Sequence, residues 1–316
     1  MYISEDEVRS LLTYDALIPA IRQALIDYSD DKAAEQSKVD QPPRTILRPG
    51  DKDWFAVMPV IYGDVIAVKN VTFFPGNASL NGHPALPTHM AVINLFSRAT
   101  GEPLAVMDGQ LVTAMRTAAV SAVALDAIAS HDVRSLGILG SGVQARSHLE
   151  VLRRVRPSLT DIRIWSRTTT MAEQLTREAG ARAVSIEDAA SCDVVLTATA
   201  SPTPILEGRW LAPNAVVLAV GAVGGNLREL DNEAVRSSWI IAESRQGVER
   251  ESGDIILSGV QVQAEIGQIL KHPQEPVPRN RRILFKSVGM AIEDLVAARL
   301  VWKAHERMKP LLRPTE

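Results

Sequence analysis

A glycine-rich stretch lies near the middle of the 316-residue chain, after an apolar run and before a segment with helical spacing. Its sequence is Gly140-Ser141-Gly142-Val143-Gln144-Ala145, a GxGxxA pattern. Gly140 permits a tight turn, Gly142 lets the backbone approach a pyrophosphate, and Ala145 keeps the helix close to the strand. The first N–H groups of the helix, with the positive end of its dipole, favour phosphate. The pattern predicts a dinucleotide site at residues 140–144, with a merely structural tight turn as the alternative.

The end of the next predicted strand distinguishes NADH from NADPH. NAD sites usually place Asp or Glu there for the ribose 2′-hydroxyl. Here the strand Ile162–Trp165 is followed by Ser166-Arg167-Thr168, and Asp161 lies at its other end. An acid would repel a 2′-phosphate, whereas Arg167 would attract it and the two hydroxyls could donate to it. We therefore expect NADPH rather than NADH. The alternative is that Arg167 is a solvated surface residue and that Thr168 only caps the following helix.

Lys69 interrupts an otherwise apolar strand-like run, Val65–Val71. An unpaired lysine is costly in such a position, which favours a functional role. If burial lowers its pKa, the ammonium can act as a proton donor.

The elements that must position these residues follow from the periodicity. Ser4 and Glu7 resemble a capping box, and residues 4–30 show helical spacing. Short strand-like runs follow at Trp54–Val60, Val65–Val71 and His89–Asn94, and residues 113–130 have helical spacing. From Val133, strands and helices alternate, which indicates a doubly wound parallel sheet. Residues 287–308 form the last predicted helix.

The expected fold class is therefore α/β: a Rossmann sheet plus an α+β domain for substrate binding and dimerisation. We predict that residues 1–118 and 287–316 form the α+β domain and that 119–286 form the NAD(P)-binding domain. The α+β domain would combine the N-terminal region with the C-terminal helix.

Composition excludes several classes of function. The net charge is -3 without a long basic run, which argues against nucleic-acid binding. The single cysteine, Cys192, cannot form a disulfide within the chain and fits a reducing compartment. The acidic N-terminus lacks signal-peptide features, and no 18-residue apolar run occurs, so we expect a cytoplasmic protein without a membrane span. No metal-ligand spacing is found, and no metal is predicted.

The whole set of motifs resembles the ornithine cyclodeaminase/mu-crystallin family, and its mu-crystallin (ketimine reductase) branch most, over nearly the whole chain. The stretches that carry the resemblance are Val57-Met58-Pro59, Val68-Lys69, Val106-Met107-Asp108-Gly109, residues 113–121, Gly142-Val143-Gln144-Ala145, residues 164–168, Ala219-Val220-Gly221-Ala222, Arg228-Glu229-Leu230-Asp231, Glu251-Ser252-Gly253-Asp254 and residues 285–294.

The resemblance implies a homodimer whose first domain supplies the dimer interface and the substrate pocket. It implies that Arg44 and Lys69 hold the substrate carboxylate, as a guanidinium and an ammonium can. It places Arg116 and Thr117 at the cofactor pyrophosphate. Other implied positions are near the substrate or cofactor: Met58, Thr88, His89, Thr197, Val220, Lys286 and Ser287, with less weight on Glu251, Gly253 and Asp254.

One departure from the family bears on the reaction. Cyclodeaminases and archaeal alanine dehydrogenases of the family carry an aspartate where Val223 stands, and cyclodeaminases carry a glutamate just before the position of Met58-Pro59. Cyclodeamination needs a base at the reacting centre, whereas reduction of a protonated ring imine needs hydride, an anchor for the carboxylate and one proton.

We therefore expect an NADPH-dependent oxidoreductase that reduces cyclic imine carboxylates such as 1-piperideine-2-carboxylate or 1-pyrroline-2-carboxylate. The alternatives are reductive amination of a 2-oxo acid with an amine, ornithine cyclodeamination, and a non-catalytic role in binding NADPH or another small ligand.

Overall fold

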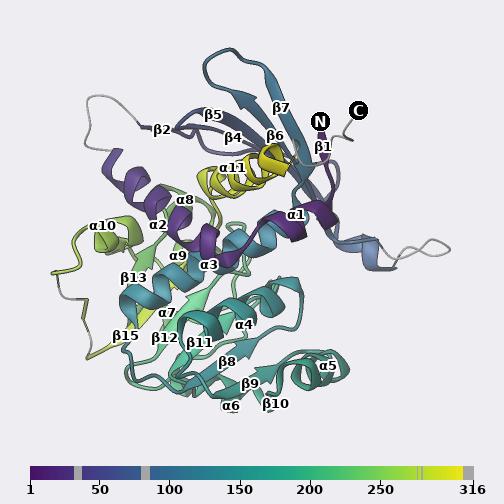
Figure 1. The fold of residues 1–316 in the computed structure, drawn as a ribbon. Coiled ribbons are helices and arrows are strands. Elements are labelled where there is room, and N and C mark those ends of the chain that lie inside the picture. The colour runs from purple at the N-terminus through teal and green to yellow at the C-terminus, as the bar shows by residue number, and fades with distance from the viewer. Residues whose placement is uncertain (32–37, 80–85, 276, 279, 309–316) are drawn as a thin grey trace. The chain divides into compact units, whose positions relative to one another are not determined.

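The computed structural model describes residues 1–31, 38–79, 86–275, 277–278 and 280–308, and the chain divides into two compact units (Figure 1). Unit 1 consists of Met1–Arg116 and Met290–Glu316, and unit 2 of Thr117–Gly289. The divisions fall at 116/117 and 289/290, where the sequence analysis expected 118/119 and 286/287. Helix α3 (Gln110–Ile128) contains the first division.

Unit 1 is built on a seven-stranded mixed sheet in the order β1-β7-β6-β5-β4-β2, with β3 also pairing with β4. Only the pair β1 and β7 is parallel among the described strands of this sheet. Its strands are β1 (Tyr2–Ile3), β2 (Val39–Asp40), β3 (Thr45–Leu47), β4 (Trp54–Tyr62), β5 (Val65–Phe73), β6 (His89–Ser97) and β7 (Pro103–Asp108). A 3₁₀ turn, η1 (Pro75–Ser79), follows β5.

One face of this sheet forms the core of unit 1. Along β4 and β5 every second residue is buried, as expected for a sheet packed on one side. Helix α11 (Ala291–Met308) packs against β4, β5 and β6, and helix α2 (Tyr14–Asp31) packs against α11 (Figure 1). The face under α11 includes Met58 and Lys69, directly paired across β4 and β5.

The N-terminal helical segment differs from the expectation. The capping box of Ser4 and Glu7 is present, but the single helix expected over 4–30 is two helices, α1 (Glu5–Leu11) and α2. Leu12 has extended dihedrals, and the Thr13 hydroxyl accepts a hydrogen bond from the Ala16 N–H at 3.4 Å. A threonine side chain that bonds to nearby backbone favours a helix start over a helix interior, so the helix is interrupted there.

Unit 2 contains an all-parallel eight-stranded sheet in the order β10-β9-β8-β11-β12-β15-β13-β14, which confirms the predicted Rossmann architecture. The order reverses between β8 and β11. Its strands are β8 (Ser135–Leu139), β9 (Asp161–Trp165), β10 (Arg182–Ala183), β11 (Val194–Thr197), β12 (Val216–Ala219), β13 (Ser238–Ala242), β14 (Ala264–Glu265) and β15 (Arg282–Lys286). β8, β11 and β12 are buried throughout, which explains their uninterrupted apolar sequences.

The connections of unit 2 are mostly short helices. They are α4 (Val143–Val155), α5 (Thr169–Ala179), α6 (Ile186–Ala190), η2 (Gly208–Trp210), α7 (Asn232–Arg236), α8 (Arg245–Glu251), α9 (Gly253–Ile256) and α10 (Ile266–Lys271). The last predicted helix, expected over 287–308, begins only at Ala291, because β15 and a turn through Gly289 precede it.

Helix α3 is long and apolar enough to cross a membrane by length and composition alone. However, 78% of its most apolar window is buried inside the protein, which is the environment of a core helix. This burial matches its sequence, which is rich in Ala and Val.

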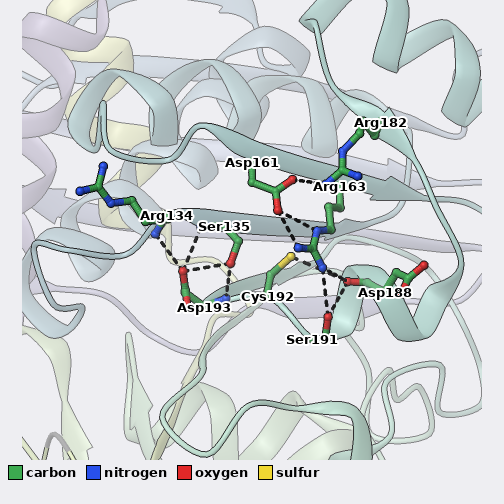
Figure 2. A network of polar contacts seen from close by, with 9 residues as sticks. All are labelled: Arg134, Ser135, Asp161, Arg163, Arg182, Asp188, Ser191, Cys192 and Asp193. Carbon is green, nitrogen blue, oxygen red and sulfur yellow. Dashed lines mark hydrogen bonds and ion pairs between the residues drawn. The ribbon is translucent and has the colours of Figure 1, made fainter.

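A polar network joins the amino ends of the strands of unit 2 (Figure 2). The Asp193 carboxylate accepts hydrogen bonds from the N–H groups of Arg134 and Ser135 at 2.8 and 2.9 Å, and Asp161 accepts two from Arg163. Cys192 is fully buried beside this network, and burial raises the pKa of its thiol to about 11. Cofactors bind at the opposite, carboxyl edge of such sheets, so this network is structural.

Candidate functional site

The predicted glycine-rich turn joins β8 to α4 at the carboxyl edge of the sheet in unit 2. Gly140 has a φ of +134°, and a Cβ there would lie 2.6 Å from the Ala198 carbonyl oxygen. Both observations require glycine. At Gly142, by contrast, a Cβ would meet no described protein atom within 4 Å. The backbone at the start of α4 is therefore accessible to a ligand.

The start of α4 has the properties of an anion site. Gly142 is the N-cap and supplies no capping side chain, so the first N–H groups of this 13-residue helix are left for another acceptor. Ala145 is fully buried, as close packing of helix on strand requires. Val143 is 67% exposed, and Gln144 Oε1 is buried without a hydrogen-bond partner among the described residues. These residues fit a dinucleotide pyrophosphate.

The segment after β9 lies next to this turn. The Ser141 hydroxyl donates to the Ser166 hydroxyl at 2.8 Å, and the Gly140 N–H donates to the Trp165 carbonyl at 2.9 Å. Arg167 is exposed, and within the described chain no hydrogen bond or ion pair holds it. Thr168 occupies the N-cap of α5, but its side chain makes no capping hydrogen bond. The exposed Arg167 is compatible with NADPH binding and with the alternative of a solvated surface residue, whereas the capping hydrogen bond of that alternative is absent.

A buried carboxylate that sequence reasoning had quoted but given no role organises the loops after β11 and β12. Glu229 accepts five hydrogen bonds: from the Thr197 hydroxyl, the Thr199 N–H and hydroxyl, and the N–H groups of Gly221 and Ala222, at 2.6 to 3.1 Å. Burial raises the pKa of Glu229, and the Lys286 charge and the Thr199 hydrogen bonds oppose this. The hydroxyl of Thr197, a predicted cofactor residue, is therefore used within the protein.

Lys286 and Ser287 are also buried and held by acids. The Lys286 ammonium lies 3.0 Å from the Asp254 carboxylate and donates to the Ala222 carbonyl at 3.0 Å. The Ser287 hydroxyl donates to Glu243 at 2.6 Å. Val220 is buried, and Val223 is partly buried and packs against the apolar core of unit 2. These four predicted residues follow or end strands at the carboxyl edge, and their contacts with a cofactor or substrate stay predictions.

Unit 1 contains the second group of predicted residues, centred on Lys69. Its Nζ lies 2.6 Å from Oδ2 of Asp294, and the two side chains are only 3% and 2% exposed. Arg116 donates through Nε to Asp294 at 3.0 Å and through Nη1 to Glu293 at 2.6 Å. Burial lowers the pKa of Lys69 to about 8. The Asp294 carboxylate opposes this decrease, and the charges of Arg116 and Arg44 add to it. The ammonium can therefore lose a proton at a pH near neutrality.

The other predicted residues of unit 1 lie around this cluster. Met58 is directly opposite Lys69 on β4, and Arg44, half-buried, precedes β3 and acts on Lys69 through its charge. His89 stacks against Phe73 with ring centroids 4.6 Å apart, and its Nδ1 is 3.4 Å from the Thr88 hydroxyl. His89 is exposed at the start of β6, and partial loss of hydration together with the Lys69 charge lowers the pKa of its ring. Thr117, predicted at the pyrophosphate, is buried at the start of unit 2.

Sequence reasoning missed the roles of four buried acids: Glu229, Glu243, Glu293 and Asp294. Each is at most 1% exposed. The available signal was the occurrence of a carboxylate inside an apolar run, as in Ala291-Ile292-Glu293-Asp294-Leu295. A buried acid requires a partner, and only the fold identifies it. No group of three or more His, Cys, Asp or Glu suited to a metal ion occurs in the described parts of the chain.

Comparison with known proteins agrees with this arrangement. The model of the ornithine cyclodeaminase/mu-crystallin family matches residues 1–309. The chain is 38% identical over 306 residues to the ketimine reductase mu-crystallin of Macropus fuliginosus, covering 95% of each protein. It is similar to the Thermococcus litoralis Δ1-pyrroline-2-carboxylate reductase solved with NADH and L-proline, with a TM-score of 0.90, 31% identity and 98% coverage of both chains.

An archaeal alanine dehydrogenase, solved as a dimer with bound NAD, has the same TM-score of 0.90 at 27% identity. The match covers 98% of this chain and 97% of the dehydrogenase chain. Both matches cover 98% of the chain and therefore extend over both units. The resemblance inferred from the motifs is confirmed: the chain belongs to the ornithine cyclodeaminase/mu-crystallin family.

Proposed function

We propose that the protein is a nicotinamide-dependent reductase of cyclic imine carboxylates, such as 1-piperideine-2-carboxylate or 1-pyrroline-2-carboxylate, and produces the cyclic amino acid. The observation that carries the proposal is Lys69: a buried ammonium, with a pKa near 8, at the position implied for the substrate carboxylate. The 38% identity to a ketimine reductase supports the same substrate class. Val223 supports reduction over cyclodeamination, because it offers no base.

Each group of residues would contribute a separate part of the chemistry. Arg44 and Lys69 would bind and orient the substrate carboxylate. The turn at residues 140–144 and the start of α4 would hold the cofactor pyrophosphate, and the bound nicotinamide supplies hydride to the imine carbon. The ring nitrogen takes one proton. Lys69 would supply it by breaking one N–H bond, and the neutral amine left behind would regain a proton from solvent.

The proposed cofactor preference is NADPH over NADH. It is supported by the absence of an acid after β9, by the exposed Arg167, and by the Thr168 hydroxyl that makes no capping bond. Relatives of known structure carry NADH or NAD, so both cofactors belong in the test.

A homodimer is the proposed assembly. The face of the unit 1 sheet opposite α11 presents apolar side chains at alternate positions, including Val92 and Val106 at 39% and 37% exposure. Apolar patches of this kind mark interaction surfaces. We expect the double substitution Val92→Asp/Val106→Asp to convert a dimer into a monomer in sedimentation or light scattering. A wild-type monomer would contradict the proposal.

The decisive assay is consumption of NADPH and NADH with each of the two cyclic imines. We expect turnover with NADPH and a loss of about a hundredfold or more in Lys69→Met, since both an anchor and a proton donor are removed. Lys303→Met is the matched control, because Lys303 is a partly exposed lysine of unit 1 paired with Asp64. Its activity should equal that of the wild type.

Other outcomes point to the alternatives. Turnover only with a 2-oxo acid plus an amine would support reductive amination, the second candidate, which the structural likeness to an alanine dehydrogenase favours. Ammonia release from ornithine without net consumption of cofactor would identify a cyclodeaminase. Tight NADPH binding with no turnover on any of these substrates would identify a binding protein.

A further inference from the structure

Asp294 contacts two cations that the sequence analysis assigned to different tasks. Its Oδ2 lies 2.6 Å from Lys69 Nζ, and its Oδ1 accepts a hydrogen bond of 3.0 Å from Arg116 Nε. Lys69 was expected at the substrate carboxylate and Arg116 at the cofactor pyrophosphate. Asp294 is thus a single buried carboxylate between the two.

The neighbouring Glu293 differs from Asp294 in its contacts. Its Oε2 accepts from Arg116 Nη1 at 2.6 Å and from the Met290 N–H at 3.2 Å. No contact between Glu293 and Lys69 is found in the described structure. Both acids are at most 1% exposed and lie in the first turn of α11. Glu293 therefore provides a comparison of equal charge and burial at the adjacent position.

We propose that Asp294 is a positioning residue for imine reduction: it fixes the Lys69 ammonium at the substrate position, keeps it separate from Arg116, and maintains it as the proton donor. The proposal rests on the proposed function of the same site. Asp294 acts through Lys69 and does not itself bind the substrate.

The energetics favour this role over simple stabilisation. Burying an ion pair costs desolvation of both charges, and apolar residues of similar volume often serve stability equally well. Here two cations and two acids are buried together at the face of the sheet that α11 covers. Keeping such a cluster in the core costs free energy. A functional role of the two cations explains why the cluster is present.

The charges around Lys69 come from several elements. Asp294 of α11 is the anion in contact with it. Arg116 of α3 and Arg44 before β3 are the cations that lower the pKa of Lys69. The charge of Lys69 in turn lowers the pKa of His89 on β6. Burial lowers the pKa of Lys69 to about 8, and Asp294 prevents a larger decrease. Without Asp294, the ammonium would face two like charges.

The test compares Asp294→Asn, Asp294→Glu and Glu293→Gln with the wild type. The titration of Lys69 is followed by NMR of protein with ¹³Cε-labelled lysine, assigned with Lys69→Met, and kcat and KM are measured against pH with 1-piperideine-2-carboxylate and NADPH. Loss of an adjacent opposite charge should move the Lys69 midpoint, and the alkaline limit of kcat/KM, to lower pH by about 1 to 3 pH units in Asp294→Asn. Glu293→Gln should leave the midpoint near that of the wild type.

Asp294→Glu retains the charge and displaces it by one methylene group. We expect a wild-type midpoint, a kcat lowered about tenfold or more and a raised KM, because the displaced ammonium transfers the proton and anchors the carboxylate less well. This variant carries the test if Asp294→Asn does not fold, and an unchanged kcat in it would overturn the positioning role.

The results separate the two proposals. A folded Asp294→Asn with the wild-type midpoint and alkaline limit would overturn the role of Asp294. The NMR titration does not depend on turnover. Absence of imine reduction by the wild type would overturn the proposed function, whatever the Lys69 midpoint is.

Discussion

The substitution Arg167→Ala tests the cofactor preference most directly. Arg167 is exposed and makes no hydrogen bond or ion pair with any described residue, so its removal leaves no partner unsatisfied. We therefore expect the free energy of unfolding to change by no more than about 0.5 kcal/mol. Any effect on catalysis then reports on the cofactor and not on the fold.

The size of the effect follows from the exposure of the side chain. In water two unit charges about 4 Å apart attract by about 1 kcal/mol, and a 2′-phosphate carries close to two negative charges at neutral pH. Arg167→Ala should therefore weaken the interaction with NADPH by about 1 to 2 kcal/mol, which lowers kcat/KM for NADPH by about 5- to 30-fold. NADH lacks the phosphate, so its kcat/KM should not change.

The assay measures kcat/KM for NADPH and NADH at low and high salt, with Arg177→Ala as the control. Arg177 is an exposed arginine in the last turn of α5, the helix that begins after Arg167 and Thr168. The NADPH effect of Arg167→Ala should shrink at high salt because screening weakens exposed charge pairs. An equal loss with both cofactors, or none with either, would refute the assignment of Arg167 to the 2′-phosphate.

Two further predictions concern the stability of unit 2 and its cofactor turn. Gly140→Ala should lower the free energy of unfolding by about 1 to 3 kcal/mol, because Gly140 has a positive φ and a Cβ there would lie 2.6 Å from the Ala198 carbonyl oxygen. Gly142→Ala should leave the free energy of unfolding unchanged and weaken NADPH binding. Thermal unfolding and cofactor titration distinguish these effects, and equal stability losses would contradict them. Hydrogen bonds from Arg163 and Arg182 lower the pKa of the Asp161 carboxyl. The ionised carboxylate therefore stabilises the fold above the unfolded-state pKa of about 3.9, and this stabilisation is lost as the pH falls through the folded-state pKa. Asp161→Asn should therefore lower Tm at pH 7 and match the wild type in strong acid, and a constant difference in Tm across this pH range would argue against the linkage.

Local sequence was sufficient for the alternation of strands and helices from Val133 and for the cofactor turn. Strands such as β8 and β11 are recognisable because a buried parallel strand has a short, continuous apolar run with turn residues on both sides. Gly140 and Gly142 could be interpreted because the turn, the strand before it and the helix after it are contiguous in the chain. Lys69 was identifiable as unusual because an ammonium in an apolar strand requires compensation.

The tertiary structure decided which groups compensate the charge of the Lys69 ammonium. Arg116 lies 178 positions from Asp294 and 177 from Glu293, and no periodicity within one segment relates residues so far apart. The same applies to Glu229, whose five donors come from the last residue of β11 and from the loops after β11 and β12. It also applies to β15, which pairs with β12 and β13. The sequence by itself determined the alternation of strands and helices from Val133 and the glycine-rich turn, because those depend on neighbours in the chain. Which buried acid meets which cation was decided only by the packing of α11 and the pairing order of the strands, because a charge is compensated by whatever lies within a few ångströms of it in space.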